Sequence, residues 1–146
     1  MKKILSLLLL CFSILPAIAQ SDVWNETVQN FIKEFDKTTD AISKEFKNLG
    51  IDATAKSGYN PVGNEIILDV RFQQEQLWNM FDKNAMDAAK AAMIQEYKTS
   101  YAQDPDFALF IKLMKDNKAC FKVSYSFEKN GKVNSKDFTI TPQEIM

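Results

Sequence analysis

The strongest constraint on the fold is a β-hairpin pattern near the C-terminus. Before its turn, apolar residues alternate with polar ones, as in a strand that is covered on one face; they are Phe121, Val123, Tyr125 and Phe127. The turn is Asn130-Gly131, a dipeptide that favours a two-residue hairpin loop because both positions tolerate positive φ. The sequence therefore predicts two antiparallel strands joined at residues 130–131.

The register of this hairpin follows from its turn, where Lys129 is set opposite Lys132. Counting outward pairs apolar residues on one face: Val123 with Phe138, and Phe121 with Ile140. The turn and the hydrophobic pattern therefore agree. Val133 is the exception, because this register directs it to the other face near the tip.

Residues 21–49 are predicted to form one long helix. Their apolar residues recur every three or four positions, close to the 3.6-residue period: Trp24, Val28, Phe31, Phe35, Ile42, Phe46 and Leu49. Ser21 or Asp22 can cap the start, and Gly50 stands where a left-handed residue ends many helices. Glu45 occupies a position where a coiled-coil seam needs an apolar residue. A helix packed on a sheet is therefore favoured over the alternative, a homodimer through helix 22–49.

A second hairpin and further helices are predicted between these two segments. Residues 51–56 and 64–72 are expected strands joined by a loop at 58–63, and the second strand alternates: Ile66, Leu68, Val70 and Phe72 on one face, Glu65, Ile67, Asp69 and Arg71 on the other. Residues 73–102 are helical, with a break expected at 82–84. Asp104-Pro105 starts a shorter helix that ends near Asn117, and residues 141–144 match a capping box.

This order of elements predicts an α+β domain with two layers. Two hairpins connected by helices suggest a four-stranded antiparallel sheet with helices packed on one face, in the order α-ββ-αα-ββ. Residues 20–146 are expected to form a single domain, because a chain of this length suits one core and no linker divides it.

The first 19 residues match an export signal. Lys2 and Lys3 precede an apolar run, Ile4–Leu15, and residues 17–19 supply a small-x-small cleavage pattern. The run is shorter than the ~20 residues that cross a bilayer as a helix, so no membrane span is predicted. We expect cleavage after residue 19 and a periplasmic or secreted location in a bacterium. The rival interpretation, a lipoprotein at Cys11, is opposed by the bulky leucines that precede it.

Composition removes several classes of function. The chain contains no histidine, so Ser-His-Asp and Cys-His catalytic sites and the common zinc and copper sites are not predicted. Its four glycines lie at expected turns or caps and form no phosphate-binding loop. Once Lys2 and Lys3 are removed, acidic residues outnumber basic ones, and Arg71 is the sole arginine. This balance argues against binding to nucleic acid or to anionic membranes. No cofactor and no metal is predicted.

Two places are candidate binding sites. If the helices cover the Phe121 face of the sheet, the opposite face presents residues of mixed polarity: Ile67, Asp69, Arg71, Cys120, Lys122, Ser124, Ser126 and Thr139. A sheet face that simply contacts water is the alternative interpretation. Cys120 would be the single cysteine of the mature chain, and a buried, unreactive thiol is the favoured interpretation. The second candidate is Tyr59 in the 58–63 loop, either a contact residue or folded back onto the core.

The sequence therefore predicts a non-enzymatic binding module of the bacterial cell envelope or secreted fluid, with an envelope protein, a peptide or a glycan as partner. The alternative is a carboxylate-based hydrolase of envelope glycans, for which Glu65 and Asp69 share one face of a strand. A cleft that brings two acids within about 10 Å would favour the hydrolase, whereas a flat sheet would oppose it.

Overall fold

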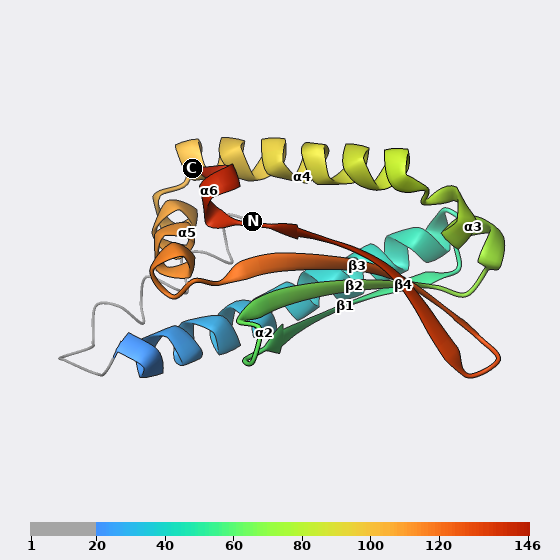
Figure 1. The fold of residues 1–146 in the computed structure, drawn as a ribbon, viewed down its shortest axis with the longest axis horizontal. Coiled ribbons are helices and arrows are strands. Elements are labelled where there is room, and N and C mark those ends of the chain that lie inside the picture. The colour runs from blue at the N-terminus through green and yellow to red at the C-terminus, as the bar shows by residue number, and fades with distance from the viewer. Residues whose placement is uncertain (1–19) are drawn as a thin grey trace.

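The computed structural model describes residues 20–146 (Figure 1), and the predicted signal segment 1–19 lies outside them. The elements follow the predicted order and confirm the α+β class: α2 (Gln20–Asn48), β1 (Ala53–Asn60), β2 (Glu65–Phe72), α3 (Glu75–Met80), α4 (Lys83–Gln103), α5 (Pro105–Asp116), β3 (Cys120–Lys129), β4 (Lys132–Ile140) and α6 (Pro142–Ile145). In the part of the chain that the structure describes, no helix is long and apolar enough to cross a bilayer.

The four strands form one sheet in the order β1-β2-β3-β4. β1 pairs antiparallel with β2, and β3 with β4, so both predicted hairpins are present. The register of the second hairpin is confirmed, with Lys129 opposite Lys132 and the two apolar pairs in place. Asn130 and Gly131 have φ values of 53° and 75°, which explains why this dipeptide suits the turn.

The junction between the hairpins corrects the prediction of an antiparallel sheet. β2 and β3 run parallel, with Ile66 opposite Phe121 and Phe72 opposite Phe127, so the sheet is mixed. The cause is the connection 73–119, whose three helices return the chain to the end of the sheet at which β2 began. A parallel neighbour requires a long crossover of this kind. Hydrophobic alternation looks the same in both directions, so the strand pattern alone carries no information on strand direction.

The helix boundaries depend on local capping, as the sequence indicates. Asp82 separates α3 from α4, and its side chain accepts a hydrogen bond from the amide of Ala85 at 2.8 Å. The carboxylate of Asp104 accepts from the amide of Phe107 at 3.2 Å at the start of α5. A capping box formed by Thr141 and Glu144 begins α6. These contacts satisfy amide groups that the first turn of a helix leaves without partners.

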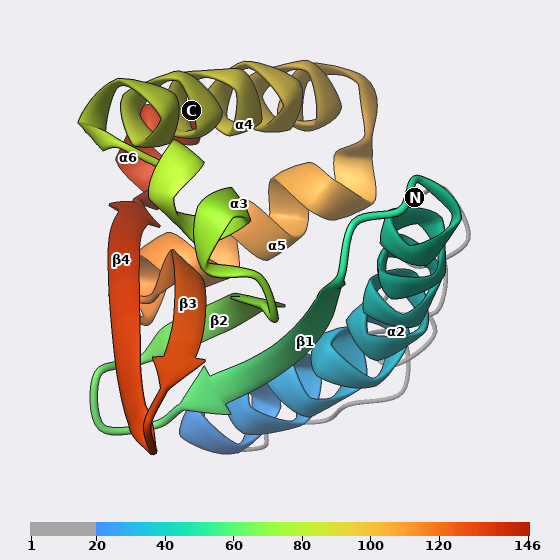
Figure 2. The same ribbon diagram turned by 90° about the vertical axis from the view of Figure 1, so that its right-hand side faces the viewer.

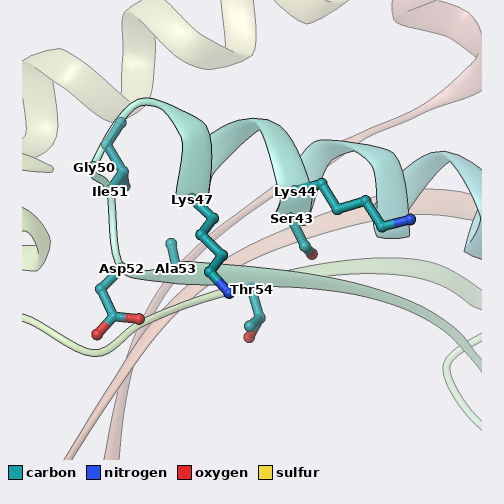
Figure 3. Close-up of a pocket in the computed structure, with 8 residues that line it drawn as sticks. All are labelled: Ser43, Lys44, Lys47, Gly50, Ile51, Asp52, Ala53 and Thr54. Carbon is teal, nitrogen blue, oxygen red and sulfur yellow. The ribbon is translucent and has the colours of Figure 1, made fainter.

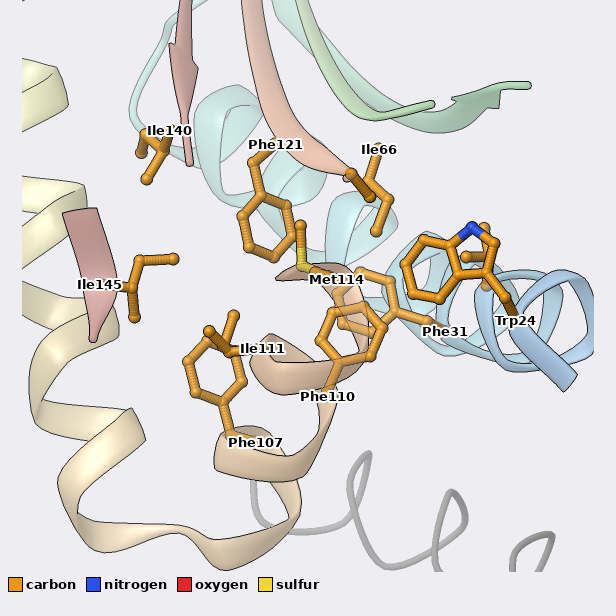
Figure 4. Packing of buried hydrophobic residues seen from close by; sticks show 12 residues of the cluster. Trp24, Phe31, Ile66, Phe107, Phe110, Ile111, Met114, Phe121, Ile140 and Ile145 are labelled. Carbon is orange, nitrogen blue, oxygen red and sulfur yellow. The ribbon is translucent and has the colours of Figure 1, made fainter. Parts of the chain in front are cut away.

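The helices supply an apolar layer on one face of the sheet. Figure 2 shows α2 beside β1 and α4 at the opposite margin of the layer. The larger group of buried side chains joins α2, α5, α6 and the sheet, and Figure 4 shows its members: Trp24, Phe31, Ile66, Phe107, Phe110, Ile111, Met114, Phe121, Ile140 and Ile145. Within it the rings of Phe31 and Phe110 stack, with centroids 4.5 Å apart.

A second, smaller group of buried residues lies at the other end of the same face. It comprises Ala53, Ala55, Val70 and Phe72, with side chains of α3 packed against them. Leu68 lies between the two groups and is only half-buried, although Ile66 and Val70, its neighbours on this face of β2, are buried. Val123, which lies opposite Leu68 on β3, is buried, so the incomplete cover of this face is local to Leu68.

Candidate functional site

A cleft of about 220 Å³ opens between α2 and α4 over the middle of the helical face. One wall is formed by α2, through Phe31, Phe35, Thr38 and Ile42. The other wall is α4, through Met93, Glu96 and Tyr97. Leu68 and Phe121 form the floor, and Phe107 of α5 closes one end. Apart from Thr38 and Glu96, every lining residue is apolar or aromatic.

The cleft exists because α2 and α4 pack against different parts of the domain. α2 packs along β1, whereas α4 packs on α5, α6 and β4. The apolar residues of α2 that line the cleft recur at helical spacing, so one stripe faces it. Phe31 is buried, while Phe35, Ile42 and Met93 keep part of their surface exposed. Sequence reasoning assigned these residues to the core, because a buried stripe and the wall of a cleft have the same period.

Tyr97 lines the cleft and packs its ring against two other lining residues. Its ring centroid lies 5.8 Å from that of Phe107 and 5.1 Å from that of Phe121. Burial raises the pKa of Tyr97 far above its usual range, and the nearby charge of Glu96 adds to the effect. The phenol therefore stays protonated and neutral at physiological pH.

Two other depressions are more open to solvent. One, of about 600 Å³, lies where α2 ends and β1 begins, and Figure 3 shows Lys44, Lys47 and Asp52 among its lining residues. The other, of about 360 Å³, lies beside the start of α4 and includes Lys136 and Phe138 of β4. Both mix lysine and aspartate side chains with apolar ones. The cleft between α2 and α4 is the most enclosed of the three and has the most apolar lining.

The open face of the sheet carries the eight residues predicted there. The registers place Ile67 opposite Lys122, and Lys122 opposite Thr139. Asp69, Arg71, Cys120, Ser124 and Ser126 occupy the same face by strand alternation. Seven of the eight are at least partly exposed, whereas Ser126 is buried. The Ser126 hydroxyl donates a hydrogen bond to Asp69 at 3.0 Å.

The charged groups of this face are paired with one another. The guanidinium of Arg71 lies 3.9 Å from the carboxylates of both Asp69 and Glu128. The ammonium of Lys122 lies 3.9 Å from the carboxylate of Asp137. Exposed pairs at such distances contribute little to stability. They leave the face with positive and negative charges close together and no strong potential of one sign.

Tyr59 lies in a strand rather than at the tip of a loop, because β1 continues to Asn60. Its ring packs against the larger core group. Its hydroxyl donates to the side-chain oxygen of Asn64 at 2.6 Å and accepts from the indole nitrogen of Trp24 at 3.2 Å. Tyr59 is thus folded back onto the core, the second of the two arrangements considered.

Cys120 is partly exposed rather than fully buried. Partial burial raises the pKa of its thiol, the negative charge of Glu65 raises it further, and Lys122 opposes the shift. The thiol is therefore less ionised at neutral pH than a free cysteine, and it is the thiolate that acts as a nucleophile or metal ligand.

The acid pair of the hydrolase hypothesis lies on the open face, outside the three cavities described above. Glu65 accepts a hydrogen bond from Asn60 at 3.0 Å, and Asp69 accepts one from Ser126. Four residues along a strand separate the two Cα atoms by about 13 Å, and, in the part of the chain that the structure describes, neither carboxylate lines a cleft of the kind that glycosidases place between their two acids. Among residues 20–146, no three potential metal ligands of the His, Cys, Asp or Glu type gather in one place.

Comparisons of this chain with protein-family models, with curated proteins and with solved structures found no match. The functional interpretation therefore depends on the residues of the chain itself.

Proposed function

We propose that this chain is an exported, non-enzymatic binding module that holds a small apolar ligand in the cleft between α2 and α4. The observation that carries the proposal is the half-buried Leu68 at the floor of an apolar cleft. Apolar surface that contacts water is unfavourable by about 25 cal/mol per Å². A ligand that covers this floor is stabilised by the same amount for each Å² that it buries.

The size of the cleft sets the size of the ligand. Apolar protein cavities of about 150 Å³ hold a benzene molecule, and this cleft measures about 220 Å³. A single aromatic ring with a substituent, or a short alkyl chain, fits such a volume. Thr38, Glu96 and Tyr97 are the polar groups within reach, a small set that suits orientation of a ligand.

The cleft can be tested with n-alkanols of increasing length, added to the ¹⁵N-labelled protein and followed by NMR. We expect shifts confined to amides around the cleft, and an affinity that rises about fourfold per methylene until the cleft is full. Leu68→Phe fills the floor and should abolish these shifts while the protein stays folded. Ile67→Phe is the matched control, because Ile67 is adjacent on β2 and faces the open side of the sheet.

Absence of any alkanol binding by a folded wild-type protein would contradict the proposal. Equal losses in both phenylalanine variants would also contradict it, because the effect would then not come from the cleft. A thermal melt of each variant shows whether it is folded.

The export component of the proposal has its own test. The signal-like residues 1–19 support removal of that segment, so the intact mass of the protein recovered from its native cells should correspond to a chain that starts at residue 20. A chain that retains Met1 inside the cytoplasm would contradict export. The mature chain also allows a light-scattering test of the alternative interpretation of α2, a homodimer through helix 22–49. Trp24, Val28 and Phe31 are buried within the domain, so such a dimer would have to use the polar side of α2.

The open sheet face remains a predicted partner surface for an envelope protein, a peptide or a glycan. Arg71→Glu combined with Lys122→Glu reverses two charges that are exposed enough to change without unfolding the domain. Crosslinking in the native envelope, followed by mass spectrometry, identifies a partner on this face. If the double variant captures the same partner as the wild type, that face is not its binding site.

A further inference from the structure

We infer that the ligand of the cleft between α2 and α4 is a small alkyl- or arylalkylamine, whose apolar part fills the cleft and whose ammonium group lies beside Glu96. This inference rests on the proposed function of the cleft and adds the chemistry of the ligand's polar end. Glu96 is the one charged residue of the lining. Its side chain is exposed, and within residues 23–146 it has no ion-pair partner.

A second carboxylate lies outside the lining of the cleft but on the side of α2 that faces it. Glu45 follows Thr38 by seven residues, or nearly two helical turns, so it projects from the same side of α2. It is exposed and, in the described part of the chain, makes no ion pair. The acidic Glu34 is already neutralised by Lys37, whose ammonium lies 2.7 Å from its carboxylate.

The lysines of α4 do not neutralise the mouth of the cleft. Lys83 is paired with Asp87 at 2.7 Å, and Lys90 is paired with Glu144 of α6 at 2.8 Å. Lys98 follows Glu96 by two residues and therefore projects from the far side of the helix. The groups without a partner on the cleft side are thus carboxylates. A cationic head is attracted there, whereas an anionic head is repelled.

Three probes of equal chain length distinguish the effect of the polar head group from that of the apolar tail: octylamine, octanol and octanoate. At neutral pH and low ionic strength we expect octylamine to bind about tenfold more tightly than octanoate, with octanol between them, since each exposed charge contact contributes a few-fold. Added salt should reduce the difference between octylamine and octanoate and leave octanol unchanged.

Glu96→Gln keeps the size of the side chain and removes its charge. This variant should bring the three affinities to within about threefold of one another, without changing the affinity for octanol. Asp40→Asn is the matched control: Asp40 is also an exposed acid, and it lies two residues from both Thr38 and Ile42, on the far side of α2. It should leave the wild-type order of affinities intact.

The outcomes distinguish this inference from the proposed function. If all three probes bind equally, or if octanoate binds best, an amine ligand is excluded, whereas the proposal that the cleft binds an apolar ligand is retained. If Glu96→Gln and Asp40→Asn reduce amine binding equally, the preference reflects the overall charge of the protein and the inference is overturned. If none of the probes binds, the proposed function itself fails.

Discussion

The hydroxyl of Ser43 accepts a hydrogen bond from the main-chain amide of Ala55 at 2.8 Å. Ser43 belongs to α2 and Ala55 to β1, which is an edge strand of the sheet. Unpaired amides on an edge strand invite association with other chains. Further along, the hydroxyl of Ser57 donates to the carboxylate of Asp36, so α2 and this edge are joined by side-chain hydrogen bonds at two places.

Ser43→Ala should lower the free energy of unfolding by about 1–2 kcal/mol, because it leaves a buried amide without a partner. Thr99→Ala is the control: like Ser43, Thr99 donates to the carbonyl four residues earlier in its helix, but it has no hydrogen bond to a strand. Urea unfolding of both variants measures the difference. Equal losses would mean that the contact with the strand contributes nothing.

Two asparagines in the left-handed region provide a second matched pair. Asn64 and Asn130 have φ values of 51° and 53°. Asn64 also accepts a hydrogen bond from Trp24 at 3.1 Å and donates to the carbonyl of Asn117. Glycine tolerates this backbone conformation, so Asn130→Gly should change stability by less than about 0.5 kcal/mol. Asn64→Gly should cost about 2–3 kcal/mol, because it removes these side-chain bonds. Similar midpoints in urea for the two variants would contradict this prediction.

The phenol of Tyr97 makes stability fall at alkaline pH. Burial raises the pKa of Tyr97 in the folded protein above its value in the unfolded chain. The stability that the protonated phenol contributes is therefore fully present below the unfolded pKa of about 10, and it is lost as the pH rises beyond that value. We expect the melting temperature of the wild type to fall more steeply than that of Tyr97→Phe between pH 9 and pH 11. Parallel curves would show that the phenol is accessible to water.

The Glu144 carboxylate should make the opposite contribution at acidic pH. Its hydrogen bond with Lys90, followed by that with the amide of Thr141, lowers the pKa of Glu144. Stability from this group is present above the unfolded pKa and is lost as pH falls through the lower folded pKa. Glu144→Gln should therefore reduce the melting temperature at pH 7 and have little effect at pH 3. The exposed pair of Lys83 and Asp87 supplies the control Asp87→Asn, which should have a smaller effect at pH 7.

Alkylation of Cys120 tests the effect of its surroundings. Because burial and Glu65 raise the pKa of the thiol, iodoacetamide at pH 8 should modify a chain that starts at residue 20, in which Cys120 is the single cysteine, more slowly when it is folded than in urea. Glu65→Gln should increase the rate in the folded state, since one of the causes of the shift is removed. A rate equal to that of the unfolded chain would identify Cys120 as an ordinary exposed thiol.

Local sequence patterns predicted most of the helices, strands and turns, whereas the remaining features depend on the tertiary arrangement. The turn at Asn130-Gly131 and the cap at Asp104 are encoded within a few residues, so they could be read from the sequence. The alternation that directs Leu68 toward the helices could be read as well. The incomplete burial of Leu68 could not be predicted, because it depends on the distance between α2 and α4. The candidate site lies in that space, formed by residues whose periodicity resembles that of any core.

Tyr59 shows the same limit on a smaller scale. The glycine, asparagine and proline around it are typical of a loop, and they predicted one over residues 58–63. Its pairing with Ile66 and its hydrogen bonds with Trp24 and Asn64 hold this segment in a strand instead. These partners come from distant parts of the chain, so a local pattern does not include them.

The parallel contact of β2 with β3 also determines the order in which the domain can assemble. Its register joins residues 65–72 to residues 120–127, so the central contact of the sheet has a high contact order and forms slowly compared with either hairpin. The core group that contains Phe31 and Ile66 is complete only when Phe121 has also been synthesised and has packed into it. We therefore expect a chain that ends before residue 120 to lack both a finished sheet and a complete core, and to remain unfolded until the last hairpin is present.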